Sequence, residues 1–187
     1  DSNSVVLTES GGITNITEAG ATDSYTVVLS SEPLASVFVS IASDAQSTLS
    51  TTSIQFTTTT WNIPQTITLT AVNDLVAEGA HDSTITHTVT STDIGYDAII
   101  VADITAHITD NDTAGVTLAQ SAGTTNIAEG GVTDSYTIVL NSKPSADVTI
   151  TLTPDAQSTV STSSIIFTTL NWNVAQTITL TAEDDGD

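Results

Sequence analysis

The sequence contains no cysteine, and its only basic residue is Lys143. Without cysteine the chain can form neither disulfides nor thiolate metal sites. Hard oxygen atoms are its plentiful ligands, and these favour calcium over zinc or copper. The 22 aspartates and glutamates give a formal net charge of −21. Charge of this sign repels nucleic acid and anionic membranes, so we expect no nucleic-acid partner and no membrane insertion. Bound divalent cations would relieve the self-repulsion.

Targeting and membrane signals are lacking as well. The sequence has no signal peptide, no membrane-spanning apolar run and no lipidation motif, and it begins with Asp1 rather than methionine. We therefore interpret it as a mature or excised segment of a longer protein. The scarcity of lysine and arginine, beside abundant threonine and serine, suits a protein outside the cell, where trypsin-like cleavage is a hazard. The expected location is extracellular or at the surface of a bacterial cell.

The apolar residues, 39% of the chain, are mostly aliphatic rather than aromatic. They alternate with polar residues in short runs bounded by glycine, proline, asparagine and aspartate, which predicts β-strands, and no stretch shows a helical period. Ile67, Leu69 and Ala71 would face the core while the intervening threonines face outward. Seven strands in about 110 residues predict an all-β, immunoglobulin-like β-sandwich. The predicted strands are 5–7, 24–29, 37–42, 54–56, 65–71, 84–90 and 99–108.

The chain contains an internal repeat. The segment NITEAGATDSYTVVL at Asn15–Leu29 recurs as NIAEGGVTDSYTIVL at Asn126–Leu140, an offset of 111 residues. The same offset relates QTITLTA at 65–71 to its copy at 176–182, without a gap. Such self-similarity is typical of tandem arrays of quasi-independent units. We predict a complete sandwich in residues 1–111 and, in residues 112–187, a second repeat that lacks the last two strands.

Oxygen-bearing side chains follow or precede several of the predicted strands. Successive antiparallel strands reverse direction, so loops distant in sequence are predicted to meet at one end of the sandwich. Calcium takes six to eight oxygen ligands, and several carboxylates gathered there would repel one another without a cation. The alternative interpretation is that these residues are solvated loop charges. Asp23 and Asp93 are not among the predicted ligands and are interpreted as surface charges. The predicted ligands of the first repeat are Glu18, Asp44, Asn73, Asp74, Glu78, Asp110, Asn111 and Asp112. Those of the second repeat are Glu129, Asp155, Asp184, Asp185 and Asp187.

Three motifs resemble the Calx-beta repeat of sodium–calcium exchangers and of very large bacterial surface proteins: ITEAG at 16–20, TITLTAVNDLVAEG at 66–79 and ADITAHITDND at 102–112. The resemblance implies a seven-stranded sandwich whose distal loops bind calcium. It implies that Glu18, the 73–74 pair with Glu78, and residues 110–112 are ligands. Asparagine replaces a family carboxylate at positions 73 and 111, and no acidic residue lies in Ser50–Ser53. These departures imply fewer bound ions or a lower affinity.

Together these features predict a calcium-binding structural repeat of a large extracellular or cell-surface protein. It would act as a metal-stiffened rod, an adhesin stalk or a fibre subunit, with neighbouring repeats and other copies of the chain as partners. One alternative is an adhesion module that binds a ligand or glycan through its loops or Trp61. Another is self-assembly, in which the second sandwich accepts strands from a neighbouring copy. Catalysis is not expected, because the only histidines, His81, His87 and His107, have no counterparts in the second repeat.

Overall fold

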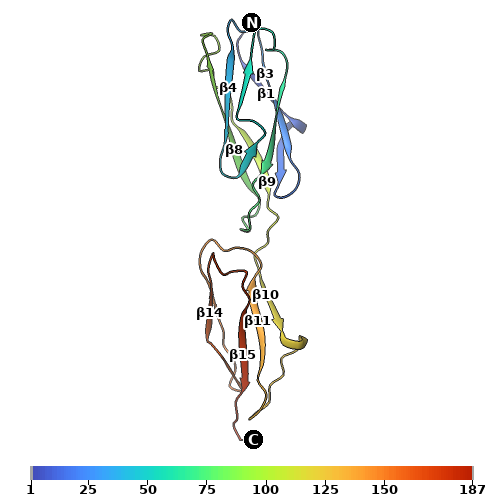
Figure 1. The fold of residues 1–187 in the computed structure, drawn as a ribbon, viewed down its shortest axis with the longest axis vertical. Helices are drawn as coiled ribbons and strands as arrows, with labels where there is room; N and C mark the ends of the chain where they lie inside the picture. Colours follow the sequence, from blue (N-terminus) through green and yellow to red (C-terminus); the bar gives the residue numbers. More distant parts are fainter. Residues whose placement is uncertain (1, 187) are drawn as a thin grey trace. The chain divides into compact units, whose positions relative to one another are not determined.

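The computed structural model describes residues 2–186, which form β-strands and two short 3-10 turns (Figure 1). Contacts divide the chain into two compact units, Asp1–Asp74 with Glu78–Asn111 and Leu75–Ala77 with Asp112–Asp187. Within the described residues, no helix is long and apolar enough to cross a membrane. The predicted all-β class is confirmed.

The first unit is a sandwich of two sheets. The strands of one sheet, in spatial order, are β1 (Val5–Glu9), β3 (Asp23–Leu29), β7 (Gln65–Ala71) and β5 (Ser47–Leu49). Those of the other are β2 (Thr14–Thr17), β9 (Ile104–Thr109), β8 (His81–Ser91), β4 (Val37–Ser43) and β6 (Ser53–Phe56). All pairs are antiparallel except β2 with β9, which run parallel. This arrangement confirms the predicted immunoglobulin-like β-sandwich.

The core of the first unit lies between these sheets and follows the alternation of the sequence. In β7, Ile67 and Leu69 are fully buried and Ala71 nearly so. Tyr25 from β3 and Phe56 from β6 are among the largest buried side chains. Burying each large apolar side chain stabilises the fold by roughly 1.5 to 3 kcal/mol relative to leaving it exposed. Trp61 is partly buried against the same core, which agrees with a packing role for this residue.

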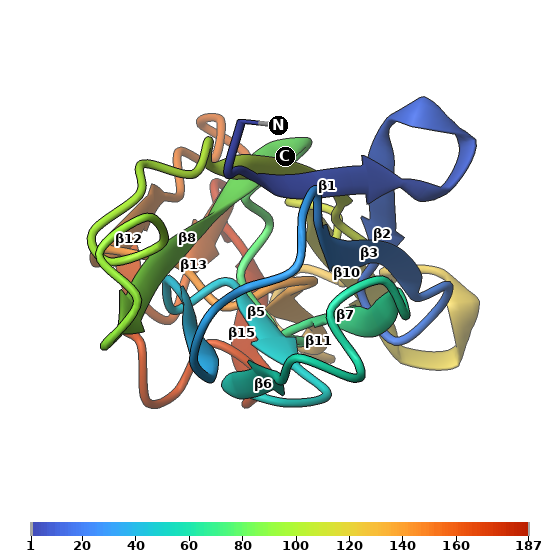
Figure 2. The same ribbon diagram turned by 90° about the horizontal axis from the view of Figure 1, so that it is seen from above.

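Where the sequence predicts one strand at residues 5–7, the structure has two, in different sheets. A 3-10 turn, η1 (Ser10–Gly12), joins β1 to β2, and Figure 2 shows it as the blue loop that projects beside these strands. Asp23 holds the turn, since its carboxylate accepts hydrogen bonds from the Ser10 hydroxyl and, at 2.9 Å, from the Asn15 amide. The sequence suggests only a surface charge at Asp23. Asp134 makes the equivalent bonds to Ser121 and Asn126 in the second unit.

The last strand of the first unit starts later than predicted. The sequence predicts a strand over 99–108, whereas β9 begins at Ile104, and residues 92–103 form a loop. Tyr96 is fully buried and anchors this loop through its hydroxyl, which donates to the Ser31 carbonyl at 2.7 Å. Asp93 is also buried and accepts a 2.7 Å hydrogen bond from the Leu34 amide, so it is not the surface charge that the sequence suggests. Specific side-chain contacts override the apolar pattern of Ile99–Val101 here.

The second unit repeats part of this sandwich. Its four-stranded sheet has β10 (Val116–Gln120), β11 (Asp134–Leu140), β15 (Gln176–Ala182) and β13 (Ser158–Val160) in the order equivalent to β1-β3-β7-β5. Its other sheet has two strands, β12 (Val148–Thr151) and β14 (Ser164–Phe167), equivalent to β4 and β6. A smaller core lies between the two sheets, with Trp172 partly buried against it.

Nearly identical segments adopt different structures in the two units. Residues 14–17, TNIT, form β2, whereas residues 125–128, TNIA, form no strand. Ile16 is 1% exposed, while its counterpart Ile127 is only partly buried. β2 takes its backbone hydrogen bonds from β9, and the described part of the second unit has no equivalent of β9. Pairing with another strand, rather than local sequence, therefore decides whether this segment is a strand.

Candidate metal centre

Glu18 is the most deeply buried carboxylate of the first unit, with 2% of its surface exposed. It directly follows β2, and its amide donates to the Thr109 carbonyl at 3.0 Å, which continues the parallel pairing of β2 with β9 by one residue. Behind it the chain turns sharply, since the Gly20 amide donates to the Thr17 carbonyl and Ala19 has a φ of 50°. The pairing and the turn fix the position of Glu18 at the end of the sandwich.

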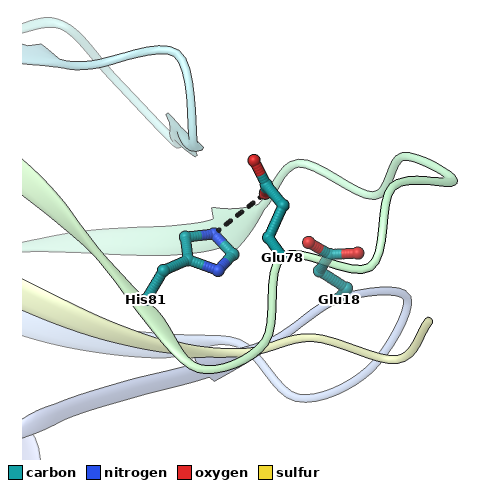
Figure 3. Close-up of side chains that lie close together, drawn as sticks. All are labelled: Glu18, Glu78 and His81. Carbon is teal, nitrogen blue, oxygen red and sulfur yellow. Dashed lines mark ion pairs between the residues drawn. The ribbon is translucent and has the colours of Figure 1, made fainter. Parts of the chain in front are cut away.

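Two other side chains converge on Glu18. Ligand atoms of Glu18, Glu78 and His81 all lie within 4.8 Å of one another (Figure 3). Glu78 lies in the connection between β7 and β8, and His81 is the first residue of β8. Oε2 of Glu78 and Nε2 of His81 are 3.5 Å apart. Two segments that are distant in sequence, one with Glu18 and one with Glu78 and His81, thus bring two carboxylates and one imidazole together.

Asp110 approaches Glu18 from the end of β9. Carboxylate oxygens of the two residues lie within 4.8 Å of one another. The orientation of Asp110 is fixed by the Gly79 amide, which donates to its Oδ2 at 2.6 Å. Glu18 therefore belongs to an oxygen group with Asp110 as well as to the group that contains His81.

Polar atoms in this region lack hydrogen-bond partners. Oε2 of Glu18 and Nε2 of His81 are both buried and accept or donate no hydrogen bond. Leaving a buried polar atom unsatisfied costs about 1 to 3 kcal/mol, and more for a charged group. Native proteins retain few such atoms, and a bound ion is one common reason for them. The two atoms therefore make this group a candidate ligand site.

The pKa of the Glu18 carboxyl is raised above its ordinary value. The main cause is burial, which disfavours the ionised form, and the negative charge of Asp110 raises the pKa further. A hydrogen bond from the Asp74 amide opposes the shift, but the charge of Asp74 adds to it. A bound cation would reverse this balance, because it would stabilise the ionised form of all three carboxylates.

The two asparagines predicted as ligands bind each other. Nδ2 of Asn111 donates to Oδ1 of Asn73 at 2.7 Å and to the Glu18 carbonyl at 3.2 Å. These bonds hold the loop after β7 and the end of β9 beside the turn after β2. In this arrangement the Asn73 side-chain oxygen is already engaged, so the asparagines position the loops that carry the carboxylates.

Asp44 is engaged differently from Glu18. Its carboxylate accepts from the Ser83 hydroxyl at 2.7 Å, the Thr84 amide at 2.8 Å and the Gln46 amide at 3.0 Å. Burial alone would raise the pKa of Asp44, but these hydrogen bonds hold it below its ordinary value. Asp44 lies outside the groups that contain Glu18, and its hydrogen bonds join the end of β4 to β8.

The predicted ligands of the second repeat are more scattered. Asp184 lies beside the turn after Glu129, with Oδ2 at 3.7 Å from the position that a Cβ on Gly130 would take. Asp155 accepts from the Gln157 amide at 3.0 Å. Within described residues 113–186, no three metal-ligating side chains come together. Glu129, Asp184 and Asp185 are exposed, and Asp187 lies outside the described residues. Asp112 belongs to the second unit by its contacts, and its role as a ligand stays a prediction.

His81 is the member of the group that sequence reasoning missed. The position equivalent to His81 lies beyond Asp187, so the repeat gives no signal for it, and His81 precedes rather than follows the predicted strand 84–90. A signal was available, because the start of that strand lies at the same end of the sandwich as the loop that carries Glu78. Extending the strand to its observed first residue, His81, would have placed the imidazole in this group.

No protein-family model matches the chain, and no curated protein matches it. Among solved structures, the chain is similar to CBD12 from CALX1.2, with 13% identity, 97% of this chain and 76% of that chain covered, and a TM-score of 0.42. The chain is also similar to the calcium binding domain CBD12 of CALX1.1, with 14% identity, 93% of this chain and 74% of that chain covered, and a TM-score of 0.42. A third similar structure is the E. coli chaperone DraB, with 9% identity, 95% of this chain and 87% of that chain covered, and a TM-score of 0.41. At these identities and TM-scores, the similarities carry no conclusion about function.

Proposed function

We propose that the chain is a calcium-binding structural module, made of β-sandwich repeats, of an extracellular or cell-surface protein. The observation that carries the proposal is the Glu18 carboxylate, which is buried beside Asp110 with one oxygen unpartnered. A buried carboxylate that faces another carboxylate is unfavourable unless a cation lies between them. The net charge of −21 adds to the demand for a cation.

Calcium fits the donor set of the oxygen group better than other common ions do. Glu18 and Asp110 supply carboxylate oxygens, and the Asp74 charge acts on Glu18 from the loop after β7. Calcium accepts six to eight such oxygens, together with backbone carbonyls and water, in a flexible geometry, whereas magnesium demands a near-ideal octahedron. The ion would join the turn after β2 to the end of β9, so its binding free energy would add to the stability of the sandwich.

Isothermal titration calorimetry with calcium, and with magnesium for comparison, tests the proposal. We expect saturable calcium binding that Glu18→Gln weakens at least tenfold, because the substitution removes the shared charge and keeps the shape of the side chain. The matched control is Glu32→Gln, which removes an exposed carboxylate from the loop after β3. Equal calcium affinity in the Glu18 and Glu32 variants would overturn the assignment of the site.

The mechanical role is a further part of the proposal. Calcium would stiffen the array into a rod, an adhesin stalk or a fibre subunit, with neighbouring repeats and other copies of the chain as partners. Small-angle scattering of the full chain in calcium and in excess chelator tests this role. We expect a more heterogeneous, flexible ensemble in chelator. Scattering profiles that superimpose in the two conditions, at a calcium concentration that calorimetry shows to be saturating, would exclude the stiffening role while leaving calcium binding intact.

A further inference from the structure

We propose that Glu18, Glu78 and His81 form a second metal site, which takes a first-row transition-metal dication such as zinc. The site shares Glu18 with the oxygen group but does not require that group to bind calcium. Its three ligands come from the turn after β2, the connection between β7 and β8, and the start of β8 (Figure 3). The absence of cysteine does not exclude this chemistry, because histidine and carboxylate are also common zinc ligands.

A hydrogen bond to the backbone fixes the tautomer of His81. Nδ1 of His81 lies 2.8 Å from the Gly79 carbonyl oxygen, which can only accept a hydrogen bond. Nδ1 therefore carries the proton, and in the neutral imidazole Nε2 presents a bare lone pair. A carbonyl that accepts from one ring nitrogen and fixes the other for the metal is a recurrent arrangement around protein-bound metals.

Nε2 of His81 lies beside two carboxylates. This buried atom has no hydrogen-bond partner, and Oε2 of Glu78 lies 3.5 Å away. The Glu18 carboxylate, whose Oε2 is also buried and unpartnered, completes the group within 4.8 Å. Two carboxylates and a nitrogen lone pair repel one another, and a dication between them would turn all three contacts into bonds.

The nitrogen ligand decides which class of ion this group prefers. Calcium is a hard cation that binds oxygen, whereas imidazole suits zinc and its neighbours in the first transition row. Three protein ligands with a water molecule in the fourth position are an established zinc arrangement. Zinc bonds of about 2.0 to 2.2 Å place tetrahedral ligands roughly 3.5 Å apart, so modest side-chain rotations would close the group around the ion.

Gly79 links the two groups through its backbone. Its amide donates to Asp110 of the oxygen group, and its carbonyl accepts from His81 of the group with Glu18 and Glu78. Its φ of 72° lies in the left-handed region that favours glycine, so the turn that provides both contacts depends on this residue. Because Glu18 is common to both groups, occupancy of one by a dication is expected to weaken the other.

Calorimetry with zinc chloride in a chelator-free buffer, using the full chain, tests the proposal. We expect zinc binding that His81→Gln weakens at least tenfold while calcium affinity changes less than twofold. The control His107→Gln removes an exposed histidine that pairs with Asp82, and it should leave zinc binding unchanged. Equal zinc affinity in the His81 and His107 variants, or no zinc binding by the wild-type chain, would overturn the proposal.

Cobalt substitution provides a second readout, because its absorption reports the nitrogen ligand directly. We expect the visible absorption of Co²⁺ bound with a nitrogen ligand in the wild-type chain, and its loss in His81→Gln. Zinc should displace this signal, and excess calcium should weaken cobalt binding through the shared Glu18. A failure of the zinc and cobalt arms with intact calcium binding would refute this site alone, and loss of calcium binding with intact cobalt absorption would refute only the proposed function.

Discussion

The hydroxyl of Tyr25 and Nε2 of His87 lie 2.8 Å apart and join the two sheets of the first unit. Tyr25, on β3, is 1% exposed, and His87, on β8, meets its ring edge-on at an interplanar angle of 88°. Burial raises the pKa of Tyr25, so the hydroxyl stays protonated in its hydrogen bond with the imidazole. Burial also lowers the pKa of His87, although a hydrogen bond with the Ala102 backbone and the charge of Asp103 partly oppose this. The pair is therefore built around a neutral histidine.

Acid should destabilise the first unit through this pair. The pKa of His87 is lower in the folded state than its ordinary value of 6.5, so the unfolded chain binds the proton first as the pH falls. The stabilisation is fully present above pH 6.5 and is lost as the pH drops from there through the folded-state pKa. One proton contributes a slope of at most about 1.4 kcal/mol per pH unit.

Chemical denaturation of the full chain between pH 5 and 8 measures this dependence, a window chosen around the ordinary histidine pKa of about 6.5. The double variant Tyr25→Phe, His87→Leu removes both partners without leaving an unsatisfied group, and its stability should vary less with pH. His107→Gln, at an exposed site, serves as the control and should retain the wild-type slope. A double variant with an unchanged slope would show that His87 is not the titrating group.

Glu18→Gln should have opposite effects on stability with and without calcium. The raised pKa means that ionised Glu18 costs the metal-free fold stability at neutral pH, and a glutamine amide can instead donate to Asp110. We expect the metal-free variant to be more stable by about 1 kcal/mol, or a rise in Tm of roughly 4 to 8 °C.

With calcium present the order should reverse. Calcium at about 100 times its Kd would stabilise the wild-type chain by about 2.7 kcal/mol, and the variant would lose most of this gain. Differential scanning calorimetry in chelator and in calcium measures the stability difference between wild type and variant in each condition. A variant that is less stable than wild type in chelator would show that Glu18 is not strained in the metal-free fold.

Asp23→Asn should weaken the turn between β1 and β2. Hydrogen bonds from Ser10, Asn15 and Ser24 hold the pKa of Asp23 below its ordinary value of 3.8. Its stabilisation is present above that pH and is lost as the pH falls through the lower, folded-state pKa. An asparagine amide would face the backbone donors, so we expect a loss of about 1 to 2 kcal/mol at pH 7 that shrinks below pH 3.8.

Urea denaturation at pH 7 and at pH 2.5 separates these regimes, since about pH 2.5 lies below the ordinary aspartate pKa. Asp134→Asn should act in the same direction on the second unit, because Asp134 accepts hydrogen bonds from the three equivalent residues and also has a lowered pKa. Glu32→Gln is the exposed control. A constant difference between wild type and Asp23→Asn across the two pH values would contradict the assigned pKa direction.

Truncating equivalent isoleucines should have unequal effects in the two units. Ile16→Ala removes a side chain that is 1% exposed and should cost about 2 to 5 kcal/mol. Ile127→Ala should cost less than about 1 kcal/mol, because no strand forms there and the side chain is only partly buried.

Each unit carries one tryptophan packed against its core, so Trp172→Phe and Trp61→Phe backgrounds report on the first and the second unit separately. Fluorescence-monitored denaturation of each isoleucine variant in the matching background gives its cost. Equal losses at Ile16 and Ile127 would mean that the second unit builds a strand at residues 125–128 in solution.

Strand alternation and the internal repeat were enough to predict the all-β sandwich. They did not predict the split of the first strand, because η1 changes sheets through contacts that Asp23 makes from β3. They also placed a strand at Ile99–Val101, where buried Tyr96 and Asp93 hold a loop instead. In each case a specific side-chain contact overrides an apolar pattern.

The candidate site was partly predictable for a similar reason. Antiparallel reversal of the strands correctly brought Glu18, Glu78 and Asp110 to one end of the sandwich. It could not predict that the Asp44 carboxylate accepts hydrogen bonds from Ser83 and Thr84, since that depends on the register of β4 with β8. It missed His81 because the predicted strand begins at residue 84 rather than at His81, and it could not show that Nε2 of His81 is buried without a hydrogen-bond partner.

The parallel pairing of β2 with β9 sets an order of assembly. β2 lies near the start of its repeat and β9 at the end, so during synthesis on a ribosome β2 emerges well before the strand with which it pairs. Until β9 has emerged, residues 14–17 would resemble residues 125–128, with apolar side chains partly open to water. During synthesis the first unit would thus stay unfinished until β9 emerges, and its unpaired sheet edge would be open to pairing with a neighbouring nascent chain.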